Sequence, residues 1–158
     1  MGIQRKIRIL SLFANIGVAE ARLNEINGVE VVVANELVKR RAELYQRIYP
    51  HSKMICGDIL DDAIYRQVVD CCLENQVDAV MATPPCQGIS TAGQQIEDDE
   101  RNSLTIPALH AISDLRPRYA ILENVPGYLK TSIVYNGEIK LITDIISDKF
   151  SAHYHISF

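Results

Sequence analysis

The chain has 158 residues, a formal net charge of −4 and 47% hydrophobic residues. This length suits one domain, and the apolar content excludes a chain that is disordered throughout. No apolar run approaches the ~20 residues of a membrane span, and none follows the basic N-terminus as in a signal peptide. We therefore expect a cytosolic protein with no membrane partner. Because nucleic-acid binders usually carry a basic face, this acidic chain is expected to bind double-stranded DNA weakly, if at all, by itself.

Short apolar runs alternate with amphipathic segments along the chain. The expected strands are 7–13, 29–34, 54–56, 77–82, 118–123 and 153–158. The expected helices are 18–26, 37–48, 61–74, 103–115 and 138–149, and the expected loops are 87–102 and 124–132. Asp61 or Asp62 can cap the helix 61–74. Strands that alternate with helices predict an α/β fold with a doubly wound, mostly parallel, Rossmann-like sheet. No repeat or linker divides the sequence, so we expect one domain over residues 1–158.

The turn after the first expected strand departs from the dinucleotide-binding pattern G-x-G-x-x-G. Asn15 occupies the first glycine position, Gly17 the second and Glu20 the third. A pyrophosphate needs close approach of the backbone and a positive helix end, and an acidic side chain in this place would repel phosphates. The turn therefore favours a nucleoside ligand without phosphates, and S-adenosylmethionine is such a ligand.

Acidic residues follow the second and third expected strands. Glu36 follows Gly17 at about the 20-residue distance that is typical of an acid that binds ribose hydroxyls. Asp58 ends the third strand, where its carboxylate is able to accept a hydrogen bond from an adenine amino group. Either side chain can instead cap the helix that follows it, and both interpretations stay open. Their occurrence together on neighbouring strand ends favours ligand binding.

A cysteine stands where the apolar run 77–82 gives way to two prolines. Pro84 and Pro85 end the strand, so Cys86 lies at a carboxyl end, where open α/β sheets place their chemistry. As a thiolate, Cys86 is a candidate nucleophile toward C6 of a pyrimidine, provided that the ring is activated at N3. The next strand, 118–123, should be a neighbour of the strand 77–82 in the sheet, and Glu123 at its end is the candidate for that activation. The alternatives are a buried structural thiol and a solvated strand end.

The remaining cysteines do not suggest a metal site. None of the four cysteines forms a C-x-x-C pair, and no histidine stands at zinc spacing. We therefore expect no bound metal, and we interpret the three cysteines other than Cys86 as reduced thiols in partly buried positions.

Several short motifs together resemble those of the cytosine-C5 DNA methyltransferases. Pro85-Cys86-Gln87 resembles the nucleophile motif of that family, and Glu123-Asn124-Val125 resembles its second catalytic motif. The segments 12–17, 35–36 and 57–59 resemble its cofactor motifs, and the segment 101–104 resembles the R-G-T/S-L stretch that follows its catalytic loop. The resemblance covers essentially the whole chain, although Asn15, Val18 and Asn102 stand where the family usually has glycine.

The resemblance implies a specific reaction. Cys86 would add to C6 of a flipped-out cytosine while Glu123 assists at N3. C5 would then take the methyl group of S-adenosylmethionine, which becomes S-adenosylhomocysteine. Flipping is needed because the reactive atoms of the base are hidden in the DNA stack. The cofactor-binding residues that the resemblance implies are Phe13, Asn15, Ile16, Gly17, Val18, Glu36, Leu37, Asp58, Ile59, Thr83, Pro85 and Leu104.

Part of the family pattern has no counterpart in these residues. We find no Q-x-R-x-R motif, no target-recognition domain and no final two motifs. The family's sheet also has a further strand beside the one expected at 118–123, so we expect a sheet that is incomplete at its C-terminal edge and prone to association. Three interpretations remain open: a truncated or split DNA methyltransferase completed by a C-terminal segment or subunit, an inactive remnant that binds cofactor or a protein, and an RNA cytosine-C5 methyltransferase.

Overall fold

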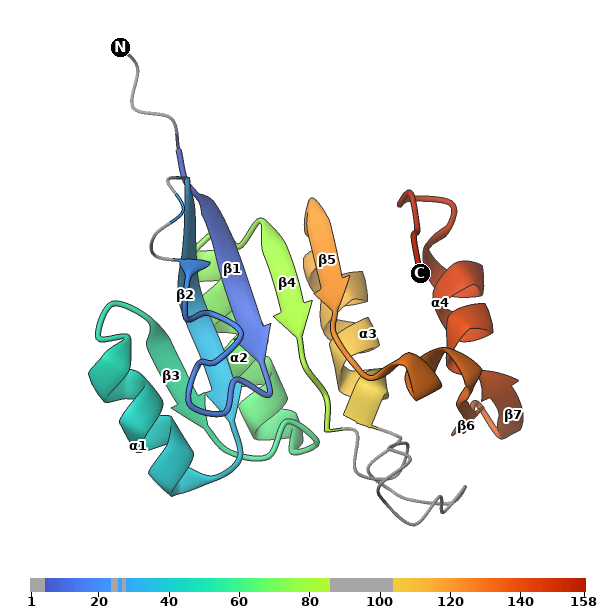
Figure 1. Ribbon diagram of the computed structural model, residues 1–158, viewed down its shortest axis with the longest axis horizontal. Helices are drawn as coiled ribbons and strands as arrows, with labels where there is room; N and C mark the ends of the chain where they lie inside the picture. Colours follow the sequence, from blue (N-terminus) through green and yellow to red (C-terminus); the bar gives the residue numbers. More distant parts are fainter. Residues whose placement is uncertain (1–4, 24–25, 27, 86–103) are drawn as a thin grey trace. The chain divides into compact units, whose positions relative to one another are not determined.

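A five-stranded parallel sheet organises the chain (Figure 1). The computed structural model describes residues 5–23, 26, 28–85 and 104–158. The sheet has the order β3-β2-β1-β4-β5, and every neighbouring pair is parallel. Its strands are β1 (Ile7–Leu12), β2 (Val29–Glu36), β3 (Lys53–Cys56), β4 (Ala79–Ala82) and β5 (Tyr119–Leu122). The predicted α/β fold with a parallel, Rossmann-like sheet is therefore confirmed.

Helices connect the strands as the alternating pattern predicts. They are α1 (Lys39–Ile48), α2 (Asp62–Glu74), α3 (Thr105–Leu115) and α4 (Ile142–Phe150). Both α1 and α2 contact β2 and β3, and α2 lies behind the sheet in the view of Figure 1. The predicted cap of α2 is confirmed, because the Asp61 carboxylate accepts from the N–H groups of Ala63 and Ile64. Among the described residues, no helix is both long and apolar enough to cross a membrane.

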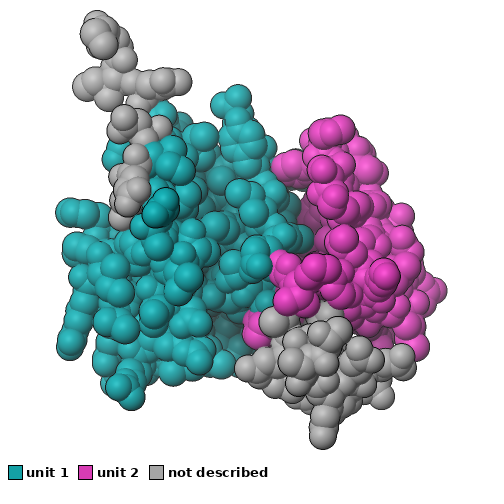
Figure 2. Space-filling view, viewed as in Figure 1, with its two compact units in different colours: residues 1–84, 110–123 teal, residues 85–109, 124–158 magenta. Residues whose placement is uncertain are grey.

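The chain divides into two compact units (Figure 2). Unit 1 comprises residues 1–84 and 110–123 and contains the whole five-stranded sheet. Unit 2 comprises residues 85–109 and 124–158, with the 3-10 helix η3 (Pro126–Lys130), the hairpin of β6 (Ser132–Tyr135) and β7 (Glu138–Leu141), and α4. In unit 2, α4 packs on η3 and on both hairpin strands. The expectation of one domain over 1–158 stays a prediction.

The central strands are apolar on both faces, as strands buried from both sides must be. One face of the sheet holds a cluster of Ile9, Val31, Ala79 and Met81, against which Leu23 packs. On β1 and β4, the side chains that alternate with these are also fully buried: Leu10, Leu12, Val80 and Ala82. Burial on both faces explains why these runs are almost continuously hydrophobic in the sequence.

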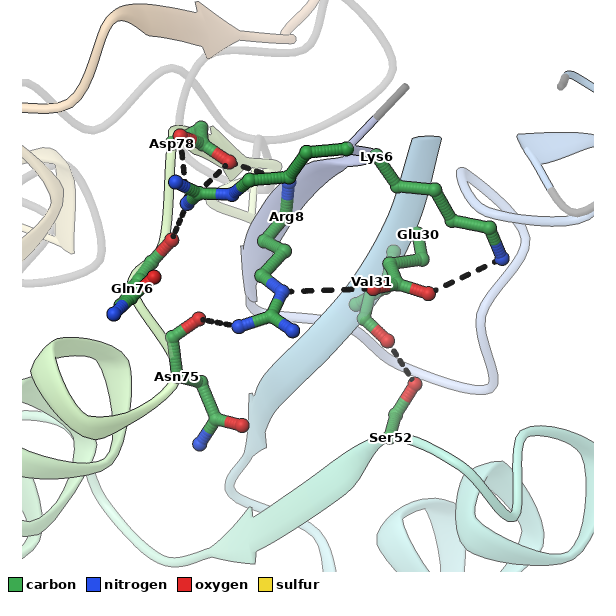
Figure 3. Close-up of polar contacts among 9 residues, drawn as sticks. Lys6, Arg8, Glu30, Val31, Ser52, Asn75, Gln76 and Asp78 are labelled. Atoms are coloured by element: carbon green, nitrogen blue, oxygen red, sulfur yellow. Dashed lines mark hydrogen bonds and ion pairs between the residues drawn. The ribbon is translucent and has the colours of Figure 1, made fainter. Parts of the chain in front are cut away.

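The amino ends of the strands are tied by a polar network (Figure 3). The Asp78 carboxylate accepts from the Arg8 N–H at 3.0 Å and pairs with Arg5 at 3.1 Å. The Arg8 guanidinium donates to the carbonyl of Asn75 at 2.8 Å, and it lies 3.6 Å from Glu30. Exposed pairs of this kind stabilise a fold only slightly. Ligands of open α/β sheets bind at the opposite edge, beyond the carboxyl ends of the strands.

Two expected elements are wrong. The described residues of the expected helix 18–26 form turns and the beginning of a 3-10 turn. Val18 is 71% exposed while Glu20 is buried, which is the reverse of what an amphipathic helix with apolar positions inward would give. Residues 153–158, expected as a strand, form a turn and irregular backbone. An alternating pattern predicts a strand only where a partner strand is available to pair with it.

One element was missed. The antiparallel pair β6 and β7 occupies 132–141, where we expected the end of a loop at 132, the start of a helix at 138 and no element between them. Consequently α4 begins at Ile142, four residues after the expected start. The turn between the strands is Asn136-Gly137, with φ of +52° and +81°. An Asn-Gly pair flanked by β-branched and apolar residues is a strong hairpin signal.

Candidate cofactor and active site

The turn after β1 has an unusual backbone. Phe13 and Asn15 both have positive φ, at 59° and 52°. This region costs most residues about 1–2 kcal/mol but suits asparagine, whose short side chain tolerates it. The N–H of Gly17 donates to the carbonyl of Ala14 at 2.8 Å and closes the turn. Asn15 thus preserves the backbone conformation that glycine would supply, and the strained Phe13 marks this turn as a candidate functional site.

Position 17 requires glycine for steric and backbone reasons. Its φ is +85°, and a Cβ atom added there would lie 2.1 Å from the ring of Tyr49. The Tyr49 hydroxyl donates to the Gly17 carbonyl at 2.7 Å. The residue immediately after α1 therefore holds the turn after β1, and only glycine fits between them.

Glu36, at the end of β2, connects this turn to α1. It is buried, one carboxylate oxygen accepts from the N–H of Asn15 at 2.9 Å, and the other accepts from the N–H of Val38 at 2.8 Å. Arg41 lies 3.9 Å from the same carboxylate. The bond to Val38 lies just before α1, which has no side-chain cap hydrogen bond, so the capping alternative is not confirmed. Each carboxylate oxygen retains a second lone pair, so the ribose-binding role stays a prediction.

The end of β3 presents a carboxylate and an apolar surface. Asp58 is exposed, and one of its oxygens accepts from the N–H of Leu60 at 2.9 Å. Asp61 rather than Asp58 caps α2. Ile59 is buried, whereas Leu37 and Leu60 are 61% and 57% exposed at neighbouring strand ends. Leu60 was not among the predicted residues, although it directly follows the segment Gly57-Asp58-Ile59 that resembles a cofactor motif.

Hydrogen bonds join the carboxyl ends of β1, β4 and β5. The Thr83 hydroxyl donates to the Phe13 carbonyl at 3.2 Å, and the Glu123 N–H donates to the Ala82 carbonyl at 3.0 Å. Strand order reverses between β1 and β4, and ligands of such sheets bind at the reversal point. The predicted adjacency of the strands that carry Thr83 and Glu123 is confirmed, and Glu123 is exposed at this edge.

Three further predicted residues, Pro85, Cys86 and Leu104, are not among the described residues of unit 1. Cys86 lies outside the described residues, as do Arg101, Asn102 and Ser103 of the segment after the long loop. Pro85 and Leu104 are described, and both belong to unit 2. The structure therefore brings together the predicted residues of unit 1 at one sheet edge, and the pairing of Cys86 with Glu123 stays a prediction.

Glu20 is a buried acid that sequence analysis assigned to a different role. It is only 1% exposed, its Oε1 accepts from the Ser11 hydroxyl, and the Tyr45 hydroxyl lies 3.5 Å from the same oxygen. Among the described residues, its Oε2 has no hydrogen-bond partner. Burial raises the pKa of the Glu20 carboxyl above its ordinary value, although the bond from Ser11 lowers it. Glu20 is therefore covered by protein, and it does not present a charge that would repel phosphates at the turn.

The parallel sheet and its reversal point define an α/β protein with a Rossmann-like fold. The model of the family described as C-5 cytosine-specific DNA methylase matches residues 7–157. The chain therefore belongs to this family, as its motifs indicated.

Curated relatives of the chain are methyltransferases, in agreement with this assignment. The chain is 42% identical to the Type II methyltransferase M1.HgaI of Avibacterium volantium, over 99% of the chain and 45% of that protein. It is 29% identical to the Type II methyltransferase M.DdeI of Desulfomicrobium norvegicum, over 92% of the chain and 33% of that protein. The chain thus spans less than half the length of these curated relatives.

Solved structures show the same fold. A prophage-encoded protein of E. coli superposes with a TM-score of 0.66 at 25% identity, over 95% of this chain and 39% of that one. A mutant of Spodoptera frugiperda DNMT2 superposes with a TM-score of 0.60 at 21% identity, over 91% of this chain and 40% of that one. In these comparisons too, the chain corresponds to less than half of a longer protein.

Proposed function

We propose that this chain is the cofactor-binding and catalytic portion of a DNA (cytosine-5-)-methyltransferase. One observation carries the proposal: several candidate groups lie at the same carboxyl edge of the sheet. They are the strained turn after β1, the carboxylates after β2 and β3, and Glu123 after β5. A bacterial cytoplasm is the compartment in which such an enzyme meets its DNA.

The residues at this edge fit S-adenosylmethionine, which supplies an electrophilic methyl group when bound. The exposed side chains of Leu37 and Leu60 offer an apolar surface to a planar base, and Asp58 offers an acceptor to its amino group. Glu36 retains lone pairs for ribose hydroxyls. Within the described part of the chain, the N–H groups of Ile16 and Val18 have no protein acceptor, so they are free to donate to a carboxylate.

Cys86 and Glu123 would carry the chemistry on the base. The Cys86 thiolate forms a bond to C6 of a flipped-out cytosine, and Glu123 provides a hydrogen bond and a proton at N3. The ring electrons then make C5 nucleophilic, and C5 accepts the methyl group. Loss of the C5 proton to a solvent base expels the Cys86 thiolate and restores the ring, and N3 returns its proton to Glu123.

A complementing polypeptide completes the proposal. The formal net charge of −4 gives this chain little attraction for phosphates by itself. Among the described residues, β5 is the edge strand of the sheet, and its Ile121 is 53% exposed. An exposed apolar edge is a template for strand addition. We propose that the part of the relatives beyond the matched region, which reads the DNA, pairs along this edge.

The remnant interpretation loses one of its supports. It rested in part on Asn15 in place of glycine, but Asn15 adopts the positive φ that the turn requires and keeps its bond to Glu36. The family whose model matches residues 7–157 is described as a DNA methylase, which favours DNA over RNA as the substrate. Catalysis on DNA is therefore the interpretation to test.

The test is covalent trapping on DNA that contains 5-fluorocytosine, in which C5 carries no removable proton. With S-adenosylmethionine and the complementing polypeptide present, the wild-type chain should form an adduct that survives denaturing electrophoresis. Cys86→Ser should form none, while Cys56→Ser, which alters an exposed cysteine at the end of β3, should form as much as the wild type. An adduct that persists in Cys86→Ser would contradict the assignment of the nucleophile.

A further inference from the structure

Two tyrosines, one in α1 and one directly after it, hold the turn after β1. Tyr45 and Tyr49 are four residues apart and therefore lie on the same side of the helix. Their ring centroids are 4.8 Å apart, and Tyr45 is fully buried. Tyr45 reaches Glu20, three residues beyond Gly17, whereas Tyr49 reaches Gly17 itself. The turn is thus held at two points by one helix.

The position of Tyr49 is fixed by its own surroundings. Its N–H donates to the Tyr45 carbonyl at 2.8 Å, and its carbonyl accepts from the Ser52 N–H at 3.1 Å and from the Gln46 amide at 3.3 Å. Burial, and next the charge of Glu20, raise the pKa of the Tyr49 hydroxyl above its ordinary value. The Tyr49 hydroxyl is therefore protonated and able to donate, and the backbone hydrogen bonds of Tyr49 hold the residue in place.

The bond from Tyr49 fixes more than one atom of the turn. The Gly17 carbonyl and the Val18 N–H belong to one planar trans peptide unit, so they point in opposite directions. A hydroxyl that holds the carbonyl on its own side must turn the N–H away from itself. The Val18 N–H has no acceptor among the described residues.

We propose that Tyr49 is a positioning residue for the cofactor: its hydroxyl orients the Gly17–Val18 peptide so that the Val18 N–H donates to the carboxylate of the amino-acid end of the ligand. The inference rests on the proposed function. Glu36 and Asp58 offer acceptors, which suit the ribose and the base, whereas the turn offers donors, which suit a carboxylate. Tyr49 itself need not touch the ligand.

The experiment compares two ligands that differ only at the proposed end. S-adenosylhomocysteine carries the amino-acid part, and 5′-methylthioadenosine lacks it. Isothermal titration of the wild-type chain should detect both. Tyr49→Phe keeps the ring against Gly17 and Tyr45 but removes the hydroxyl. Its affinity for S-adenosylhomocysteine should fall about five- to tenfold, as expected for one hydrogen bond, while its affinity for 5′-methylthioadenosine should stay within about twofold.

A matched control is available on α2, another helix of unit 1. The hydroxyl of Tyr65, on α2, donates to Asp114 at 2.7 Å, and Tyr65 is half-buried as Tyr49 is. Tyr65→Phe should leave both affinities within about twofold of the wild type, because it removes a similar bond away from the turn. Circular dichroism checks that each variant is folded.

The outcomes separate the inference from the function it rests on. If the wild-type chain binds neither ligand at millimolar concentration, the proposed cofactor site itself fails. If the wild type binds but Tyr49→Phe binds S-adenosylhomocysteine equally well, or loses both ligands equally, the positioning role is overturned. A second measurement is the amide resonance of Val18, which should move on adding S-adenosylhomocysteine and move less in Tyr49→Phe.

Discussion

The two halves of the sheet in unit 1 differ in how far their strands are held by contacts within the unit. We call the half with β1, β2 and β3 the cofactor side and the half that ends at β5 the open side. On the β1–β2–β3 side, the strand ends are tied to each other and to α1 by Glu36 and Tyr49. On the other side, β5 pairs only with β4 among the described residues, and Tyr119 and Ile121 on it are exposed. The cofactor side is therefore built from contacts within this unit, whereas the side that carries Glu123 is open to a further strand.

If the cofactor side is as tightly fitted as its contacts indicate, Gly17→Ala should produce the largest loss. The new methyl group would meet the ring of Tyr49 at 2.1 Å, in a backbone conformation with φ of +85°. We expect the free energy of unfolding to fall by about 2–4 kcal/mol, from backbone strain and overpacking together. Denaturant unfolding followed by circular dichroism measures this.

Gly28→Ala is the control for Gly17→Ala. Gly28 has a φ of +102°, but nothing lies within 4 Å of an added Cβ. It should therefore lose only the cost of the backbone conformation, about 1 kcal/mol. Equal losses in the two variants would show that Tyr49 yields to the methyl group and that the turn is not tightly held.

The open side predicts a smaller effect, and on association rather than folding. Ile121→Lys places a charge on the exposed β5 edge and should weaken binding of the complementing polypeptide about tenfold, since charged edges resist strand pairing. Leu73→Lys alters an equally exposed side chain on α2 and should leave this affinity unchanged. Both variants should keep their own stability within about 0.5 kcal/mol. Sedimentation or titration with the complementing polypeptide measures the affinities, and equal affinities would exclude the β5 edge as the interface.

The sequence predicted the sheet well because its strands are buried on both faces. Runs such as the one ending at Ala82 have few alternative structures, and the prolines that follow fix where they stop. The Asp61 cap and the adjacency of the strands leading to Thr83 and Glu123 followed from the same pattern.

The local failures arise from tertiary contacts that a pattern does not contain. The segment after Gly17 contains good helix formers such as Ala19, Ala21 and Leu23, but burial of Glu20 against Ser11 and Tyr45 holds it as turns. Nothing in the sequence indicated that Tyr49 would lie against Gly17, because the two are 32 residues apart along the chain. Such contacts decide which residues position a site, whereas motifs indicate which residues touch the ligand.

Glu20 offers the smallest test of the cofactor side, through its dependence on pH. Because burial raises the pKa of Glu20 in the folded chain, its protonated form stabilises the fold fully below the ordinary glutamate pKa of 4.5, and this stabilisation is lost as pH rises through the raised pKa. Glu20→Gln keeps a neutral group beside Ser11 and does not titrate. The variant should therefore gain stability relative to the wild type as pH rises above 4.5, and the gain should level off above the raised pKa. Denaturant unfolding of both chains between pH 4 and 8, in steps of about one unit, measures the difference. A difference that stays constant with pH, or that turns against the variant at high pH, would mean that Glu20 is ionised in the fold and stabilised by Ser11 and Tyr45.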